Sequence, residues 1–212
     1  MKADELKTKV EQVMAAVQAL PPSPQRHLIA IGGPPASGKS TLAETLQKRL
    51  QESGIPCGLV PMDGFHLDNQ VLDARALRDR KGAPETFDLE GFANLLSALQ
   101  TQGVVNVPTF DRENDRVIEN GQTITADERH VIVEGNYLFL DAPGWRELQR
   151  FWSYGAFISP PLEELRQRLI ERWLDNNLPM DAAVAKADGN DLVNARLVLA
   201  EQLHDSIEME LR

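Results

Sequence analysis

The feature that most constrains the fold is the stretch GGPPASGKST at residues 32–41, which directly follows the apolar run HLIAI. The pattern G-x-x-x-x-G-K-[ST] is satisfied there by Gly33, Gly38, Lys39 and Ser40. Its glycines permit backbone dihedrals that turn successive N–H groups toward an anionic oxygen, and the helix that follows directs its positive dipole end to the same point. The alternative is a chance match in a loop, which a chain of this length produces in roughly 1% of cases. A strand before the pattern and a helix after it favour a loop that holds polyphosphate.

Each polar side chain of this loop has an expected role. Lys39 would reach the β- and γ-phosphates, Ser40 would ligate Mg²⁺, and Thr41 would touch the α-phosphate. The other contacts to the nucleotide are expected from the loop itself, at Gly33, Pro34, Ala36, Ser37 and Gly38.

Strands and helices are expected to alternate along most of the chain. Strand-like segments lie at 27–31, 57–62, 104–110, 130–135, 154–159 and, as a last edge strand, 206–211. Helical segments lie at 3–20, 38–53, 88–101, 160–176 and 190–203. This order predicts an α/β fold of the P-loop type, a three-layer α/β/α sandwich with a mainly parallel sheet and a helical lid.

The domain division follows from the same segments. An N-terminal helix and linker are expected at 1–24, and one phosphate-binding domain at 25–212. The connection at about 64–87 is long for such a fold and is a candidate for binding an acceptor. The lid is expected at about 165–190.

Composition excludes some classes of partner. Lys and Arg total 22 against 32 Asp and Glu, a net charge of −10, so nucleic acid is not expected as a partner. Cys57 is the only cysteine, no apolar run reaches the roughly 20 residues of a membrane span, and the N-terminus lacks a signal-peptide core. A cytoplasmic protein is expected, and whether it forms a homodimer is left open.

Asp63 is the candidate for the chemical step. It follows the second expected strand in PMDGFHLDN, and residues just past the ends of parallel strands lie on the ligand side of the sheet. A carboxylate there would accept the proton of a hydroxyl that attacks the γ-phosphorus. The Asp-Gly dipeptide at 63–64 is equally well explained as a simple turn.

Four motifs in order, GGPPASGKST, PMDGFH, RKGAPETFD and VIVEGNY, resemble those of the kinases grouped with uridine kinase, phosphoribulokinase and bacterial pantothenate kinase. Within that group the sequence is most similar to small bacterial proteins described as fructose-transport-system kinases or nucleoside/nucleotide kinase-like proteins. The resemblance covers about residues 25–212. It implies transfer from ATP to a small-molecule hydroxyl, with Asp63 as base and Glu134 assisting Mg²⁺. For Glu134 a helix N-cap or a buried salt bridge is the alternative.

The resemblance also implies a mobile lid that carries arginines. The segment LRQRLIERW supplies Arg166, Arg168 and Arg172, and the last two share a helix face. Arg172 is the preferred catalytic arginine, because positive charge near the transferring phosphoryl group stabilises it. Glu164 and Glu171 leave open a surface helix held by ion pairs.

The acceptor is expected between Asp63 and the long connection. His66 would bind a substrate hydroxyl or serve the structure. Arg80 and Lys81 would bind an anionic group or hold their loop, and Asp88 would bind a diol or cap its helix.

A second set of acceptor candidates lies farther along the chain. In VPTFDRENDR, Phe110 replaces a tyrosine usual in the resembling kinases, and Arg112 with Arg116 would select a phosphorylated or carboxylated acceptor. Asn194, with Asn190 as a partner or only a helix cap, and Tyr137 are further pocket candidates. The three tryptophans are expected to serve packing; they are Trp145, Trp152 and Trp173.

The sequence therefore favours a kinase that uses ATP and Mg²⁺ on a sugar, nucleoside or pantothenate-like acceptor. A nucleotide hydrolase or switch that regulates a partner, such as a transport system, is the alternative from another class. A nucleotide binder that has lost catalysis is a third.

Overall fold

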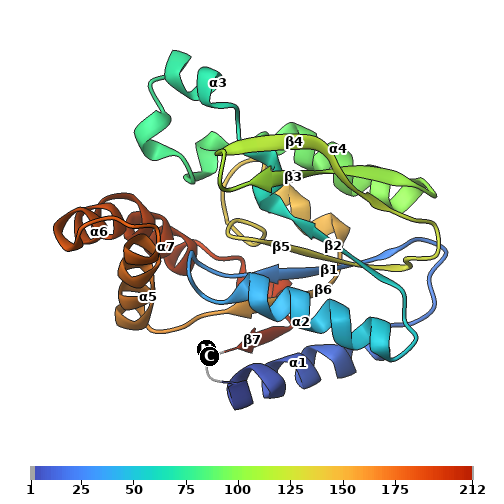
Figure 1. Cartoon of the computed structure of the whole chain (residues 1–212). Helices are drawn as coiled ribbons and strands as arrows, with labels where there is room; N and C mark the ends of the chain where they lie inside the picture. The colour runs from blue at the N-terminus through green and yellow to red at the C-terminus, as the bar shows by residue number, and fades with distance from the viewer. Residues whose placement is uncertain (1–2, 212) are drawn as a thin grey trace.

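The computed structural model describes residues 3–211, and its centre is a five-stranded sheet in the order β2-β5-β1-β6-β7 (Figure 1). All four strand pairings in this sheet are parallel. The strands are β1 His27–Gly32, β2 Cys57–Pro61, β5 His130–Gly135, β6 Trp152–Ile158 and β7 Met209–Leu211. This confirms the predicted α/β fold and the edge position of the last strand.

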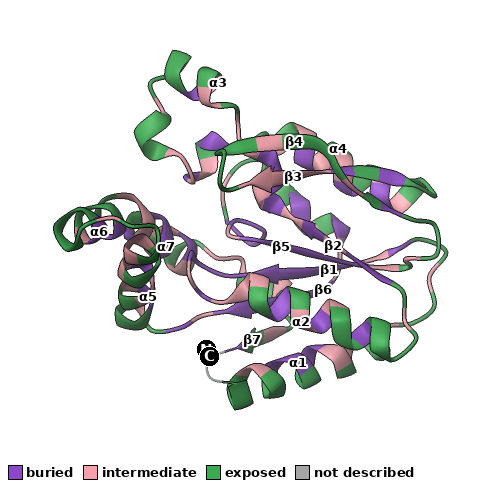
Figure 2. Cartoon of the chain, viewed as in Figure 1, coloured by how far each residue is buried: buried purple, intermediate pink, exposed green. Residues whose placement is uncertain are grey.

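Helices cover both faces of the sheet because its central strands are apolar on both sides. In β1, Leu28 and Ala30 pack into one core, and Ile29 with Ile31 pack into the other. Helices α1 Ala3–Gln18 and α2 Lys39–Glu52 cover the second face, and α4 Leu89–Thr101 covers the first. Figure 2 shows the strands as the buried layer between these helices.

The strand predicted at 104–110 does not join the main sheet. It forms β3 Val105–Asp111, which pairs with β4 Arg116–Ile124 in a separate antiparallel hairpin. The sequence pattern missed β4 because its residues are mostly exposed, and within it only Ile124 is buried. This β3–β4 hairpin lies along β2 and the turn that follows it, where the Gln122 side chain donates to the carbonyl of Leu59 (2.8 Å) and Pro108 packs against Gly64.

Short helices and the lid complete the described chain. The segment predicted as the lid, at about residues 165–190, falls within a helical group that is called the lid helices, or the lid, below: α5 Leu162–Asp175, α6 Met180–Lys186, the π-helical turn η5 Ala187–Asp191 and α7 Leu192–Ala200. The segment at 64–87, called the excursion below, contains α3 Asn69–Ala74. The 3₁₀ helices are η1 Met62–Phe65, η2 Arg78–Arg80, η3 Pro84–Thr86, η4 Arg146–Phe151 and η6 His204–Ser206. Within residues 3–211, no helix has the length and apolar character required to cross a bilayer.

A buried arginine fastens β1 to the elements beside it. Arg26 is 4% exposed and donates hydrogen bonds to backbone carbonyls at the end of α4 and at the turn that follows β4. The acceptors are the carbonyl oxygens of Leu99, Gln102, Gly103, Thr125 and Glu128. Desolvation lowers the pKa of this guanidinium from its usual value.

We expect Arg26→Met to lower the free energy of unfolding by about 3 kcal/mol, because several buried carbonyls lose a charged donor. Urea denaturation followed by circular dichroism measures the change. The control is Arg146→Met, which removes only an exposed ion pair with Asp141 and should cost at most about 1 kcal/mol. Equal stabilities of the two variants would contradict this role of Arg26.

Candidate active site

The loop between β1 and α2 has the geometry of an anion cradle. Gly38, at the N-terminal end of α2, has a φ of 95°, which favours glycine. A Cβ on Gly33 would lie 2.7 Å from the carbonyl oxygen of Ile158, so the loop packs closely against the end of β6. Beside it, the Ser37 hydroxyl oxygen is buried without a hydrogen-bond partner in the described chain. The loop therefore keeps an unused polar group next to the place where phosphate oxygens are expected.

Glu134, the residue of β5 that is paired with Pro61 of β2, lies directly beside this loop. Its Oε1 accepts from the Ser40 hydroxyl (3.0 Å), and its Oε2 lies 4.0 Å from the Lys39 ammonium nitrogen. Burial raises the pKa of this carboxyl, and the Lys39 charge opposes the rise. Glu134 is thus not a helix cap, and its ion pair with Lys39 is the buried salt bridge that the sequence left open as an alternative.

This donor set fits Mg²⁺. A hydroxyl and a carboxylate oxygen on one wall are the hard ligands that Mg²⁺ prefers, with phosphate oxygens and waters supplying the remainder. Residues 3–211 contain no group of three His, Cys, Asp or Glu side chains arranged to hold a metal alone.

Asp63 lies in η1, immediately after β2, and lines the same cleft as Lys39. Its Oδ2 accepts from Arg112 Nη2 (2.7 Å), and its backbone carbonyl accepts from His66. The neighbouring Gly64 is required for more than a turn, because a Cβ there would collide with the Pro108 carbonyl group in β3.

We expect Gly64→Ala to lower the free energy of unfolding by about 1–3 kcal/mol, because the added methyl forces β3 away from the Asp63 loop. Thermal and urea denaturation would measure it. Gly189→Ala is the matched control, because its Cβ would meet nothing within 4 Å. A Gly64→Ala protein as stable as the control would mean that the hairpin is free to move away from Asp63.

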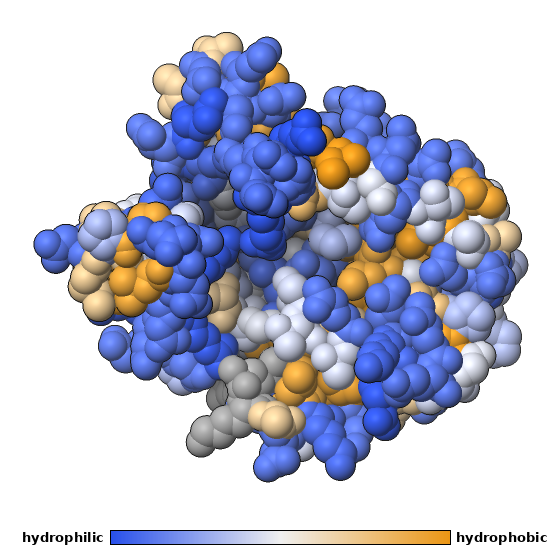
Figure 3. Space-filling model, viewed as in Figure 1, coloured by the Kyte–Doolittle hydropathy of each residue, from blue (hydrophilic) through white to orange (hydrophobic). Residues whose placement is uncertain are grey.

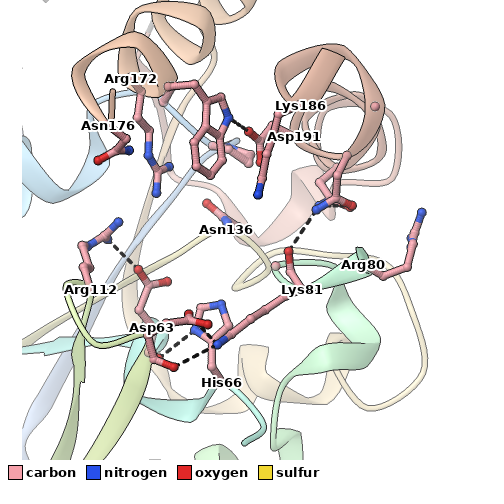
Figure 4. Close-up of a pocket in the computed structure, with 18 of the residues that line it drawn as sticks. Asp63, His66, Arg80, Lys81, Arg112, Asn136, Arg172, Asn176, Lys186 and Asp191 are labelled. Atoms are coloured by element: carbon pink, nitrogen blue, oxygen red, sulfur yellow. Dashed lines mark hydrogen bonds and ion pairs between the residues drawn. The ribbon is translucent and has the colours of Figure 1, made fainter. Parts of the chain in front are cut away.

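The cleft has a volume of about 1190 Å³ and lies between the excursion and the lid. In Figure 3 it is the hollow between these two parts, with hydrophilic residues around its rim. Figure 4 shows two facing walls: Asp63, His66 and Lys81 on one side, and Arg172 with Asp191 on the other. Both walls and the phosphate loop therefore open onto one space.

The wall formed by the excursion and the hairpin combines aromatic and charged groups. The His66 ring packs against Phe87 and Phe110, at centroid distances of 4.2 and 4.7 Å. Burial lowers the pKa of His66, and its Nδ1 lies 2.9 Å from the Asp63 carbonyl oxygen. Because a carbonyl only accepts, Nδ1 carries the proton and the neutral ring keeps Nε2 as an acceptor.

Lys81 joins three parts of the site. Its ammonium contacts Asp115 Oδ1 at the hairpin tip (2.6 Å) and Asn69 Oδ1 (2.7 Å), while its own carbonyl accepts from Asn190 in the lid (2.9 Å). Arg80 also lines the cleft and forms an exposed ion pair with Glu85 (3.1 Å). Both residues hold the excursion in place as well as facing the cleft.

The three arginines predicted in the lid lie in different places. Arg168 lines the cleft and also supports the phosphate loop, because its Nη1 donates to the carbonyls of Ala36 and Ser37 (3.2 Å each) while its Nη2 contacts Glu164. Arg172 lines the cleft, and no carboxylate pairs with it among residues 3–211. Arg166 forms a two-pronged pair with Asp188 and lies outside the cleft.

Two predicted acceptor residues lie elsewhere. Tyr137 is fully buried, and its hydroxyl donates to the carbonyl of Gly82, so it belongs to the core and not to the cleft wall. Asp88 accepts from the Gly91 N–H (3.0 Å) and caps α4, which is the alternative the sequence left open. Asn194 does line the cleft, is 2% exposed, and its Oδ1 has no partner in the described chain.

The sequence missed several residues of the cleft. Trp173, predicted only to pack, lines it and donates from Nε1 to Asp191 Oδ2 (2.6 Å), with Lys186 Nζ 4.6 Å from the ring centroid. Burial raises the pKa of Asp191. Asn136, which also lines the cleft, has a buried Oδ1 without a partner in the described chain. Asn136 directly follows the buried strand β5, and this position was the one feature of the sequence that could have identified it.

The family model described as Phosphoribulokinase / Uridine kinase family matches residues 28–160, more than half of the chain. The chain belongs to the phosphoribulokinase/uridine kinase family. Its members are P-loop kinases of small molecules, and this chain is accordingly a phosphotransferase with an alcohol group as acceptor. Kinases of this family use ATP.

Individual relatives agree with membership in this family. The crystal structure of a provisionally named fructose transport system kinase from Silicibacter sp. TM1040 matches with a TM-score of 0.91 and 45% identity, covering 96% of this chain and 98% of that one. The uncharacterised protein YggC of Escherichia coli K12 is 36% identical over 201 residues, covering 94% of this chain and 83% of its own length. A pantothenate kinase of Streptococcus pneumoniae is 30% identical over 154 residues, 71% of this chain and 50% of its own.

Proposed function

We propose that the protein transfers the γ-phosphoryl group of ATP to a hydroxyl of a small metabolite bound between Asp63 and the excursion. The observation that carries this proposal is that the Asp63 carboxylate and the Lys39 ammonium line one cleft, with Glu134 and Ser40 in contact beside Lys39. Such a cleft has room for a nucleotide and a second molecule. A sugar, a nucleoside or a pantothenate-like acid would fit the names of its relatives.

In the proposed reaction Asp63 accepts the proton of the acceptor hydroxyl while its oxygen forms a bond to the γ-phosphorus. The bond from that phosphorus to the β-phosphate oxygen breaks, and ADP leaves. Lys39 and Arg172 hold positive charge against the transferring group, where it stabilises the transition state. Arg168 keeps the loop backbone in the shape that binds the phosphates.

Ser40 and Glu134 would hold Mg²⁺ in this proposal, and a bound ion would supply positive charge to the β- and γ-phosphate oxygens. His66 would offer its unprotonated Nε2 to a hydroxyl of the acceptor. The kinase domain would comprise residues 25–212, with the excursion binding the acceptor and residues 165–190 acting as the lid. Residues 1–24 would take no part in the reaction.

An ATP-consumption screen over sugars, nucleosides, pantothenate-like acids and their monophosphates tests the proposal. We expect at least one acceptor to stimulate ADP formation, and ³¹P NMR to detect a phosphate ester instead of free phosphate. Steady ATP hydrolysis with no ester from any acceptor would contradict it and favour a hydrolase.

A further inference from the structure

The ion pair between Arg112 and Asp63 joins the proposed catalytic base to an exposed arginine. The two side chains come from different elements, η1 and the turn after β3, and meet at 2.7 Å. Arg112 is 60% exposed, whereas Asp63 is 24% exposed. Figure 4 shows the guanidinium reaching to Asp63 from the hairpin side of the cleft. An ion pair this exposed adds little stability, so its position calls for another explanation.

The other cations on this wall have counter-charges that take no part in the proposed chemistry. Lys81 pairs with Asp115, Arg80 with Glu85, and Arg78 with Asp73. Among the described residues that form these pairs, Arg112 alone is neutralised by the carboxylate that must accept a proton. When Asp63 takes that proton it becomes neutral, and Arg112 then loses its counter-charge.

The cleft as a whole favours an anionic guest. Basic residues that line it outnumber acidic ones by eight to six, although the chain carries a net charge of −10. Lys39 and Arg172 would be engaged by the nucleotide phosphates, which leaves Arg112 for another anion. A guanidinium binds a carboxylate or a phosphate through two parallel hydrogen bonds, which is stronger than the single contact seen with Asp63.

We infer that the acceptor carries a carboxylate or phosphate group near its reacting hydroxyl, and that Arg112 leaves Asp63 to bind this group. The inference rests on the proposed function of Asp63 as the base. Because Arg112 Nη2 lies 2.7 Å from Asp63 Oδ2, an acid group within a few bonds of the reacting hydroxyl would be in reach of the guanidinium. A short hydroxy acid and a sugar phosphate share this chemistry, and a neutral nucleoside or polyol lacks it.

Binding measured without turnover tests the inference directly. With the phosphate loop filled by a non-hydrolysable ATP analogue and Mg²⁺, two matched pairs of probes are titrated by calorimetry: gluconate against glucitol, and ribose 5-phosphate against ribose. We expect the acid member of at least one pair to bind at least about tenfold more tightly than its neutral counterpart. The pair that shows this preference distinguishes a carboxylate from a phosphate.

Substitutions of Arg112 test whether this side chain causes the preference for the acid probe. Arg112→Met should reduce it to about twofold or less, and Arg112→Lys should retain part of it because the charge remains. Arg146→Met, which removes an exposed ion pair outside the cleft, should leave it unchanged. Because Arg112 is exposed, both Arg112 variants are expected to fold, which thermal denaturation verifies.

The inference is overturned if neither acid probe binds better than its neutral partner, or if the preference survives Arg112→Met. These results differ from a failure of the proposed function. Phosphorylation of a neutral alcohol that depends on Asp63, with no gain from an acid group, would overturn the inference and leave the kinase mechanism intact. Phosphorylation that does not depend on Asp63 would instead contradict the proposed mechanism.

Discussion

Asp63→Asn is expected to lower acceptor-dependent phosphoryl transfer by about 10²–10⁴-fold while changing the dissociation constant for ATP by less than about twofold. Asparagine has nearly the same shape as aspartate but cannot take the hydroxyl proton. Asp63 forms no hydrogen bond or ion pair with the described phosphate loop, so nucleotide binding has no reason to change.

The measurement combines ADP release in the presence of an acceptor with calorimetric titration of ATP. Asp73→Asn is a suitable control, because it neutralises an exposed excursion carboxylate outside the cleft and should leave transfer within about threefold of the original. Undiminished transfer by Asp63→Asn would show that the base is another group or that none is needed.

Lys39→Met is expected to reduce kcat/KM by about 10²–10³-fold or more, because it removes the charge that faces the transferring phosphoryl group. It should also lower the free energy of unfolding by about 1–2 kcal/mol, since the buried carboxylate of Glu134 loses its nearby cation.

The double variant Lys39→Met/Glu134→Gln separates these two effects. Removing the buried negative charge should restore most of the stability. Activity should remain low, because the double variant lacks both the lysine and the proposed Mg²⁺ ligand. Denaturation and steady-state kinetics on the three proteins measure both quantities. If Lys39→Met kept its activity, the loop would not bind the triphosphate in the expected way.

Short local patterns were enough to predict the sheet and the position of the phosphate loop. The apolar runs ending at Gly32, Pro61 and Gly135 became adjacent parallel strands, and residues just past their ends therefore lie at one edge. This explains why Lys39 and Asp63 line one cleft although 24 positions separate them in the sequence. Strand order of this kind follows from burial and from the connections that parallel strands require.

The other parts of the fold and of the site could not be predicted, because they depend on contacts between residues far apart in the sequence. Strand β4 is mostly exposed, so the alternation that marks a half-buried strand is weak. The Arg112–Asp63 pair joins residues 49 positions apart and exists because the β3–β4 hairpin lies along β2 and the turn that follows it. Trp173 resembles a packing residue until the π-helical turn η5 brings Asp191 Oδ2 within 2.6 Å of its ring nitrogen Nε1.

The most direct test of the central claim is a crystal structure with Mg²⁺, a non-hydrolysable ATP analogue and an acceptor identified by the screen. We expect one acceptor hydroxyl to lie about 2.6–3.2 Å from the Asp63 carboxylate and to point at the γ-phosphorus, opposite the bridging oxygen. An acceptor bound away from Asp63, or an Asp63 separated from the γ-phosphate by other side chains, would contradict it.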